Sequence, residues 1–418
     1  MMYTDGLENL VSGIGTDQDK TTHYNYTFTP IPQYEADAMY RGDWLSRKII
    51  DIIPDDMTRE WRTWQAEQAE EVYKAEKSLA VKEKINEAKK WARLYGGAAI
   101  LIGDGTDKPE QPLEVNSITK DGIKYLRVFS RYDLSPGEIN SDLSSEYFKL
   151  PEIYSINGIS IHRSRFVIFD GLPLPPRARE TNQGWGDSVF DAIKEAILHC
   201  GATNGNIMAL INEMKIDIVK VPALDDNLST QDGTNRLTKR FNLANRLKST
   251  IRMLLLGADE TYEQKQANLN GLPELMRLFL QVAAGAADIP ITRLLGQSPS
   301  GLASTGESDI RNYYDNIRSQ QNTDLRAELE PLDNALIRHT LGDYPEGISY
   351  EWNSLWQMSP QEKADVDHKN AQTDKIYIDS ALFPDEALRK SITDKLVENG
   401  TYPSLDQHIL DDTDNATD

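Results

Sequence analysis

The chain has 418 residues, of which 39% are hydrophobic and 27% are charged, and its formal net charge is −21. This composition excludes an intrinsically disordered chain, and no apolar run approaches the ~20 residues that a membrane-spanning helix needs. One cysteine, Cys200, excludes an internal disulfide and a cysteine-based zinc site, and we predict that it fills the core. The first 20 residues are polar and acidic, so we expect no signal peptide and folding in a cytosol.

The acidic net charge argues against tight binding to nucleic acid, because such affinity comes from neutralising phosphates with basic residues. It also suits a nucleic acid that must slide past the protein without being trapped. Composition alone leaves both interpretations open.

The N-terminal part predicts an arm followed by helices. Residues 1–40 are interpreted as a loosely ordered arm. Isoleucines between Asp43 and Ile53 predict a buried helix that Pro54 ends. Asp55 or Asp56 is then placed to cap a second helix that contains Trp61 and Trp64.

The next predicted element is one amphipathic helix over residues 72–95, which Gly96 and Gly97 would end with a left-handed cap. Residues 98–102, AAILI, then predict a short buried strand. Further strands are predicted at 125–129, 153–156 and 166–169. Asn157-Gly158 predicts a hairpin, and the proline-rich residues 173–176, which suit neither a helix nor a central strand, are interpreted as a domain boundary.

A long helix is predicted from Ser188 to Glu213, with Ser188 and Asp191 as a capping box. A strand at 215–221, a polar loop and a second helix at 234–251 follow. Two helices therefore flank a short β insertion.

The last third predicts a strand at 253–256, a helix at 273–287 and a flexible loop at 297–306. Ser304 and Glu307 suggest a capping box for a long helix, in which Pro331 predicts a kink. A strand at 348–352 precedes Ser359-Pro360-Gln361-Glu362, which is a specific helix start.

Several segments together resemble the phage portal protein family, over about residues 40 to 400. They are YRGDWLSRKIIDIIPDDMTREW (40–61), WARLYGGAAILIGDG (91–105), RVFSRYDLSP (127–136), IHRSRFVIFDG (161–171), GWGDSVFDAI (184–193) and DIPITRLLGQSPSGLASTGESDIRNYYDNI (288–317). Each motif alone is weak, but their order and spacing are specific.

The resemblance implies an α+β portal fold with an α/β wing, two long stem helices flanking a small β-containing clip, and a C-terminal helical crown region. The implied layout is an N-terminal arm (1–40), first part of the wing (41–172), stem helix (184–213), clip (214–233), second stem helix (234–252), second part of the wing (253–296), tunnel loop (297–306), long kinked helix (307–341), crown-proximal region (342–404) and acidic tail (405–418).

The resemblance also implies a function. Portal proteins form rings, usually of about twelve subunits, at a capsid vertex, and double-stranded DNA passes through them in packaging and ejection. The expected partners are further copies of the chain, that DNA, the terminase large subunit, the major capsid protein and a head–tail adaptor, with no membrane. We expect the protein in the virion, made in the host cytoplasm. The tunnel-loop residues expected to act are Gln297, Ser298, Ser300, Gly301, Leu302, Ser304, Thr305 and Gly306.

Enzyme motifs are scarce, so we expect no catalytic residues, cofactor or metal. No phosphate-binding GxxxxGK[ST] loop is present, which excludes the packaging ATPase itself. One alternative is an anti-defence phosphodiesterase that cleaves cyclic oligonucleotides and needs two H-x-[ST] motifs, one histidine acting as base and the other as acid. The sequence has one match, His162-Arg163-Ser164. A structural adaptor unrelated to DNA is a second alternative.

The sharpest charge feature lies between Thr234 and Gly257, where six basic residues occur and no acidic one. Four of them fall within about a third of a helix circumference, and we call them the basic face: Arg236, Lys239, Arg240 and Arg246. They would face either passing DNA or acidic groups of the same or a neighbouring subunit. Trp44, Trp61, Trp64 and Trp91 are predicted to be core residues rather than base-stacking platforms.

Overall fold

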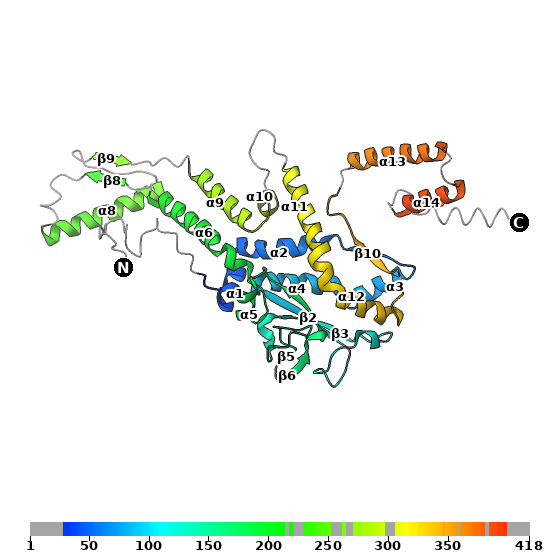
Figure 1. Cartoon of the computed structure of the whole chain (residues 1–418). Coiled ribbons are helices and arrows are strands. Elements are labelled where there is room, and N and C mark those ends of the chain that lie inside the picture. The colour runs from blue at the N-terminus through cyan, green and yellow to red at the C-terminus, as the bar shows by residue number, and fades with distance from the viewer. Residues whose placement is uncertain are drawn as a thin grey trace, which may run out of the picture. The chain divides into compact units, whose positions relative to one another are not determined.

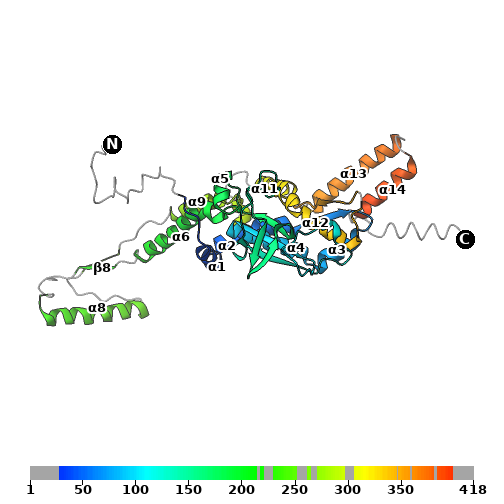
Figure 2. The same ribbon diagram turned by 60° about the horizontal axis from the view of Figure 1, so that its bottom comes forward.

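A computed structural model describes residues 28–213, 217–220, 229–251, 261–264, 271–296, 306–345, 347–357, 360–380 and 384–398. The chain divides between Asn353 and Ser354 into two compact units. Figures 1 and 2 show the course of the chain from two directions. The first unit contains the mixed α/β part, and the second contains two helices.

The first unit is built on an antiparallel sheet in the order β3-β2-β7, formed by Tyr125–Ser130, Gly97–Gly103 and Phe166–Asp170. Ile100 lies opposite Val128 on one side and Val167 on the other. All residues of β2 are buried, because both faces of the strand are covered and alternate residues point to opposite faces. The three predicted strands are confirmed.

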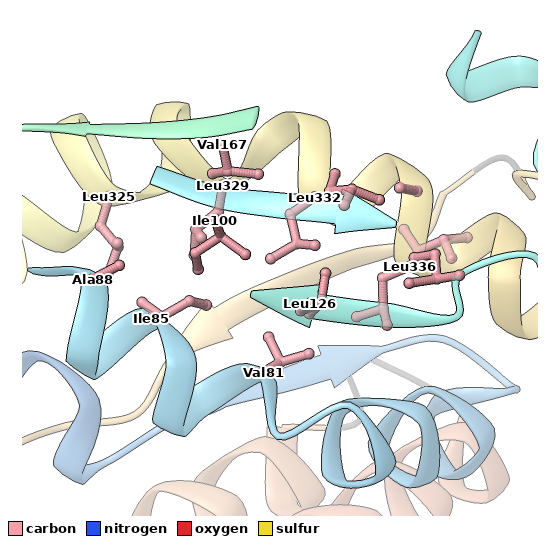
Figure 3. Close-up of a cluster of buried hydrophobic side chains, with 14 of the residues drawn as sticks. Val81, Ile85, Ala88, Ile100, Leu126, Val167, Leu325, Leu329, Leu332 and Leu336 are labelled. Atoms are coloured by element: carbon pink, nitrogen blue, oxygen red, sulfur yellow. The ribbon is translucent and has the colours of Figure 1, made fainter. Parts of the chain in front are cut away.

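One face of this sheet packs on α4 (Val81–Tyr95) and on α12 (Arg326–Leu341). Figure 3 shows the apolar side chains that meet there: Val81, Ile85 and Ala88 from α4; Ile100, Leu126 and Val167 from the sheet; and Leu325, Leu329, Leu332 and Leu336 from the C-terminal helical run. Each large aliphatic side chain buried in this way contributes about 1.5–3 kcal/mol. This layer joins residues more than 200 positions apart in the sequence.

The other face carries a second cluster that includes Ala99, Leu101, Tyr154 and Trp185. It connects β2 to a small sheet in the order β4-β5-β6, formed by Ser135–Pro136, Ile153–Ile156 and Ile159–His162. Asn157 and Gly158 have φ of 51° and 83°. A two-residue hairpin with a type I′ turn requires a positive φ at both of these positions. The predicted hairpin is confirmed.

The segment interpreted as an arm contains a helix, α1 (Gln33–Gly42), which corrects that interpretation for residues 33–40. Two carboxylates fasten it to neighbouring helices. The Tyr95 hydroxyl donates to Asp37 at 2.6 Å, and the Tyr40 hydroxyl donates to Asp51 at 2.9 Å.

The prediction that Pro54 ends a helix is wrong, because α2 runs from Trp44 to Arg59 with Pro54 inside it. A proline removes one backbone hydrogen bond, and the buried apolar face on both sides of Pro54, from Ile49 to Met57, outweighs that loss. Asp56 therefore caps no second helix. Trp64 lies instead in a strand, β1 (Arg62–Gln65), which pairs with β10 (Ser349–Trp352) and confirms the strand predicted at 348–352.

The single helix predicted over 72–95 is two helices, α3 (Ala69–Ser78) and α4. Ala80 breaks the run with a φ of 51°, in the left-handed region that an alanine rarely adopts. Gly96 ends α4 as predicted, with a φ of 84° and its N–H donating to the Ala92 carbonyl.

The helix predicted from Ser188 to Glu213 is α6 (Val189–Glu213), and it begins as expected. The backbone N–H of Ser188 donates to the Asp191 carboxylate at 3.0 Å, and the Ser188 hydroxyl accepts from the backbone of Phe190 at 3.1 Å. Cys200 is buried on this helix, as predicted. Before it lies α5 (Pro176–Thr181), so Pro176 starts a helix despite the prediction for residues 173–176.

The strand predicted at 215–221 is β8 (Asp217–Lys220), and its partner is β9 (Thr261–Gln264), which the sequence did not predict. The helix between them is α8 (Gln231–Ile251), which starts three residues earlier than expected. The strand predicted at 253–256 lies outside the described residues. The helix predicted at 273–287 is α9 (Leu272–Ala286), and it packs against α6.

A near-continuous helical run precedes β10: α11 (Glu307–Gln320), the wider turn η4 (Gln321–Leu325) and α12. The predicted capping box is wrong, because Gly306 is the cap and Glu307 is already the first helical residue. The departure from regular α-helix lies at η4, before Pro331, which sits inside α12.

Four further short helices belong to this unit. They are α10 (Ile291–Leu295), η1 (Val115–Ser117), η2 (Arg131–Asp133) and η3 (Arg163–Arg165).

The second unit contains α13 (Pro360–Ser380) and α14 (Asp385–Glu398). Pro360 is the first helical residue, as predicted. Lys395 and Asp374 form an ion pair at 3.6 Å between the two helices. Over the described residues of both units, no helix is long and apolar enough to cross a membrane.

Candidate functional site

The predicted tunnel loop lies almost wholly outside the described residues, since only Gly306 of residues 297–306 is described. The residues that border it are well defined. Gly296 ends α10 with a φ of 68°, and Gly306 precedes α11 with a φ of 67°. Both glycines adopt the left-handed conformation that frees the chain to change direction. The roles of Gln297, Ser298, Ser300, Gly301, Leu302, Ser304 and Thr305 stay predictions.

The basic face belongs to α8. Arg236, Lys239 and Arg240 are exposed, and the Arg236 guanidinium donates to the Asp232 carbonyl at 3.3 Å. The side chain of Arg246 lies outside the part of the chain whose burial is described. Exposure of the first three is compatible with a partner outside the subunit, and their role stays a prediction.

His162, the histidine of the lone H-x-S match, has structural partners. Its Nδ1 lies 2.8 Å from the Ser164 hydroxyl and accepts from the Ser164 backbone at 3.2 Å. The same hydroxyl accepts from the backbone of Leu113 at 2.7 Å, and the His162 backbone donates to the Pro109 carbonyl. Burial lowers the pKa of His162. The pair thus holds a turn in place.

The described part of the first unit contains, among others, cavities of about 430 Å³ and 400 Å³. The larger lies between α12 and β10 and includes Arg326, Glu330 and Tyr350; the smaller includes Asp104 and Arg127. Neither cavity is lined by a histidine. Among the described residues, no group of three histidine, cysteine, aspartate or glutamate side chains is placed to hold a metal ion.

The tryptophans divide between core and surface. Trp64 is buried, and Trp61 and Trp91 pack partly buried against the main core. Trp44 is 55% exposed, which corrects its prediction as a core residue. It occupies the first position of α2, and the Lys48 ammonium lies 5.6 Å from its ring.

Sequence reasoning missed a buried charge cluster at Arg62. Its guanidinium is fully buried and contacts Glu76 at 2.7 Å and Asp333 at 2.6 Å. Burial opposes its charge, but the carboxylates of Asp333 and Glu76 raise the pKa of Arg62. The cluster connects β1, α3 and α12. Trp61 and Trp64 flank Arg62 in the sequence and suggest a buried segment. No sequence pattern near Arg62 predicts that Glu76 and Asp333 are its partners, because they lie 14 and 271 residues away.

A second missed group is Asp56, which is 1% exposed and accepts hydrogen bonds from Arg293 and Tyr313. These partners lie on α10 and α11, on either side of the predicted tunnel loop. The partners are more than 230 residues from Asp56 in sequence. No local pattern could have paired them.

A family model described as phage portal protein matches residues 34–376. Because this match spans more than half of the 418 residues, the chain belongs to the phage portal protein family.

Three curated relatives each align with at least 97% of the chain. A protein of Caulobacter sp. (strain RHG1), named anti-CBASS protein Acb1, is 41% identical over 98% of this chain and 69% of its own length. A protein of the same name from Sphingomonas paeninsulae is 37% identical over 97% of this chain and 67% of its own length. An uncharacterized protein of Haemophilus influenzae is 29% identical over 100% of this chain and 95% of its own length.

Solved structures with a similar fold come from gene transfer agent (GTA) particles. The neck of the native particle computed with C12 symmetry contains a chain with a TM-score of 0.52 and 12% identity, over 87% of this chain and 94% of that one. The neck of the empty particle computed with C6 symmetry contains one with a TM-score of 0.50 and 13% identity, over 90% and 95%. At these identities the likeness concerns the fold alone.

Proposed function

We propose that the protein assembles into a closed ring of about twelve subunits at a capsid vertex and acts there as the conduit for double-stranded DNA in packaging and ejection. The observation that carries this proposal is the portal family match over residues 34–376 together with the fold shared with neck proteins of GTA particles. The C12 symmetry of the native GTA neck supports a ring of about twelve subunits.

Exposed apolar side chains on two packed helices support self-assembly. On α6, Met208 and Leu210 are 52% and 44% exposed; on α9, Leu278 and Val282 are 55% and 54% exposed. Soluble monomers rarely expose many large apolar residues on adjoining elements, and such surfaces mark protein contacts. A ring needs a head-to-tail interface in which two different surfaces of each subunit meet.

The strongly acidic composition fits a conduit through which DNA slides. Few phosphates would be neutralised, so few counterions would be released and the duplex would not be held. In this proposal the tunnel loop approaches the duplex, and the basic face is the local exception to the acidic surface.

The partners that follow are the terminase large subunit, which would supply the energy for translocation, the major capsid protein around the ring and a head–tail adaptor. The protein would be made in the host cytoplasm and act in the virion.

We further propose that the chain is not an enzyme. The main alternative comes from the two relatives named anti-CBASS protein Acb1. About a third of each of these relatives has no counterpart in this chain, and the hydrogen bonds of His162 to Ser164 and Pro109 support a structural role for it. Incubation of the purified chain with cyclic oligonucleotides, followed by chromatography of the products, tests the alternative. We expect no hydrolysis, and turnover that His162→Ala abolishes would contradict this.

Electron microscopy of the purified chain tests the main proposal. Class averages viewed down the symmetry axis should show a closed ring with a central hole, and mass photometry should give one species near twelve times 47.2 kDa. Monomers or dimers alone, across a range of salt and protein concentration, would contradict a conduit.

A further inference from the structure

One buried carboxylate fastens both helices that border residues 297–305. Asp56 lies on α2 and is 1% exposed. The Arg293 guanidinium of α10 donates to both oxygens of Asp56, with Nε and a terminal nitrogen each at 2.9 Å. The Tyr313 hydroxyl of α11 donates to the same carboxylate at 3.0 Å. Arg59 adds a bond at 3.3 Å.

The two partners of Asp56 lie on opposite sides of residues 297–305 in the sequence. Arg293 lies four residues before Gln297 (297 − 293), and Tyr313 lies eight residues after Thr305 (313 − 305). One side chain of α2 therefore holds the chain on both sides of the segment. The flanking glycines, Gly296 and Gly306, both have a left-handed backbone, and a Cβ at Gly296 would meet no atom within 4 Å. The two helix ends are therefore held by the side-chain bonds to Asp56 and not by packing around Gly296.

A buried carboxylate is costly unless charged and polar donors compensate it. Here a two-pronged arginine contact, a hydroxyl and a second arginine do so, and charge-assisted bonds of this kind are short and directional. Burial and the Asp56 carboxylate raise the pKa of Tyr313, so its hydroxyl stays a donor at any physiological pH. The bond to Asp56 raises the pKa of Arg293. Arg293 and Tyr313 therefore both remain donors to the Asp56 carboxylate.

Two neighbouring bonds attach the same region to α2. The Lys48 ammonium donates to the Leu294 carbonyl at 2.9 Å, and the buried Gln321 amide donates to the Met57 carbonyl at 2.7 Å. Each holds one side of the segment, whereas Asp56 bonds to both.

We propose that Asp56 is a positioning residue that holds α10 and α11 in register on α2, so that a force on residues 297–305 is transmitted to the wing rather than absorbed by movement of the two helix ends. This inference rests on the proposed function in one respect, namely that DNA exerts that force. The register itself is independent of DNA.

Hydrogen exchange of the full-length chain measures the register directly. In Asp56→Asn, amides in residues 291–296 and 307–315 should exchange at least about tenfold faster, because the charge-assisted bonds to both helices are weakened. Asp55→Asn is the matched control. Asp55 is the adjacent residue, and its carboxylate bonds to Lys90 and Asn86 of α4. It should leave both segments unchanged.

Two milder variants keep the inference testable if Asp56→Asn folds poorly. Tyr313→Phe removes only the bond from α11 and should accelerate exchange mainly in residues 307–315. Arg293→Gln removes the bidentate contact from α10 and should act mainly on residues 291–296. Exchange in these segments that equals wild type in all three variants would overturn the role of Asp56.

DNA packaging and retention by the same variants test whether Asp56 matters for the proposed function. If exchange accelerates and rings form but DNA packaging and retention stay normal, Asp56 holds the helices without positioning a segment that DNA loads. If wild-type protein forms no ring, the proposed function fails, and the exchange result still decides whether Asp56 fixes the two helices.

Discussion

His339 is a nearly buried histidine of α12 whose ring accepts a hydrogen bond from the backbone of Ile123. It is 8% exposed, and its Nδ1 accepts from the Ile123 backbone N–H at 3.2 Å. Its own carbonyl accepts from Asp121 at 2.8 Å. Burial is the main cause that lowers the pKa of His339 in the folded protein, because a charged imidazolium loses hydration there.

This arrangement predicts loss of stability in mild acid. With a folded pKa below the unfolded value of about 6.5, the unfolded chain binds the proton more readily, so the free energy of unfolding falls as pH drops below that value. His339→Asn keeps an acceptor near Ile123 and cannot titrate in this range. Urea unfolding at pH 7.5 and 5.5 should show a smaller difference between the two pH values in this variant than in wild type.

His368→Asn is the control for that experiment. His368 is exposed on α13, and its replacement should leave the pH dependence as it is in wild type. An unchanged pH dependence in His339→Asn would show that His339 is not a source of acid lability.

At the scale of residues, the sequence predicts what is local and misses what is distant. The capping bonds of Ser188 and the left-handed Gly96 follow from residues within a few positions of each other, and both are confirmed. The partners of Asp56 and Arg62 are not local, since Arg62 pairs with Asp333, 271 residues away. Only the packing of α2, α10, α11 and α12 brings such groups together.

At the scale of elements, the break at Ala80 shows where periodicity fails. The apolar spacing continues from α3 into α4, and alanine is the best helix former, so nothing in residues 72–95 marks a break. Burial of Val72 and Ala75 on one side of the break and Val81 and Ile85 on the other requires the turn. Tertiary packing therefore overrides helix propensity here.

The strained backbone at Ala80 predicts that a glycine is better there. Ala80→Gly should raise the free energy of unfolding by about 0.5–1 kcal/mol, because glycine adopts a positive φ without the steric penalty of a Cβ. Lys84→Gly, inside α4, should lower it by about 1 kcal/mol. Urea unfolding of both variants measures the contrast, and destabilisation by Ala80→Gly would contradict the left-handed turn.

The pairing of β8 with β9 illustrates another limit at this scale. The alternation around Ile216 and Ile218 predicts a strand but no partner, and the partner follows 41 residues after Lys220 (261 − 220). A four-residue strand such as TYEQ carries too little pattern to be recognised by itself. The sequence therefore predicts β8 but not its partner β9.

At the scale of the whole molecule, assembly should depend on the apolar surface of α6 and α9. Leu278→Asp places a charge on α9 where the side chain is now 55% exposed, so the isolated subunit loses little stability. In a ring with this surface at the interface, the charge would be buried without a partner, which is strongly unfavourable. Mass photometry should show the ring replaced by smaller species.

Leu143→Asp is the matched control for assembly. Leu143 is 82% exposed and lies in the stretch before β5, outside α6 and α9. It makes the same chemical change, and rings should still form. Normal rings in Leu278→Asp would place the subunit interface elsewhere.

The last prediction concerns the basic face of α8, the local exception in a chain of net charge −21. Double replacement of Arg236 and Lys239 by Glu changes the net charge by −4 (two changes of −2). If these residues meet the phosphates of passing DNA, rings should form normally, and genome retention should fall, more so at low salt, where screening is weakest.

Two exposed cations of the second unit, Lys375 and Arg389, give a control with the same change of −4. This control variant should retain DNA as wild type does, which separates the position of the charges from their sum. Weaker ring assembly in the α8 variant alone would assign the basic face to the subunit interface, where carboxylates of a neighbouring subunit would offset the mutual repulsion of its like charges. Normal assembly and normal retention would identify a solvated helix face and contradict both roles.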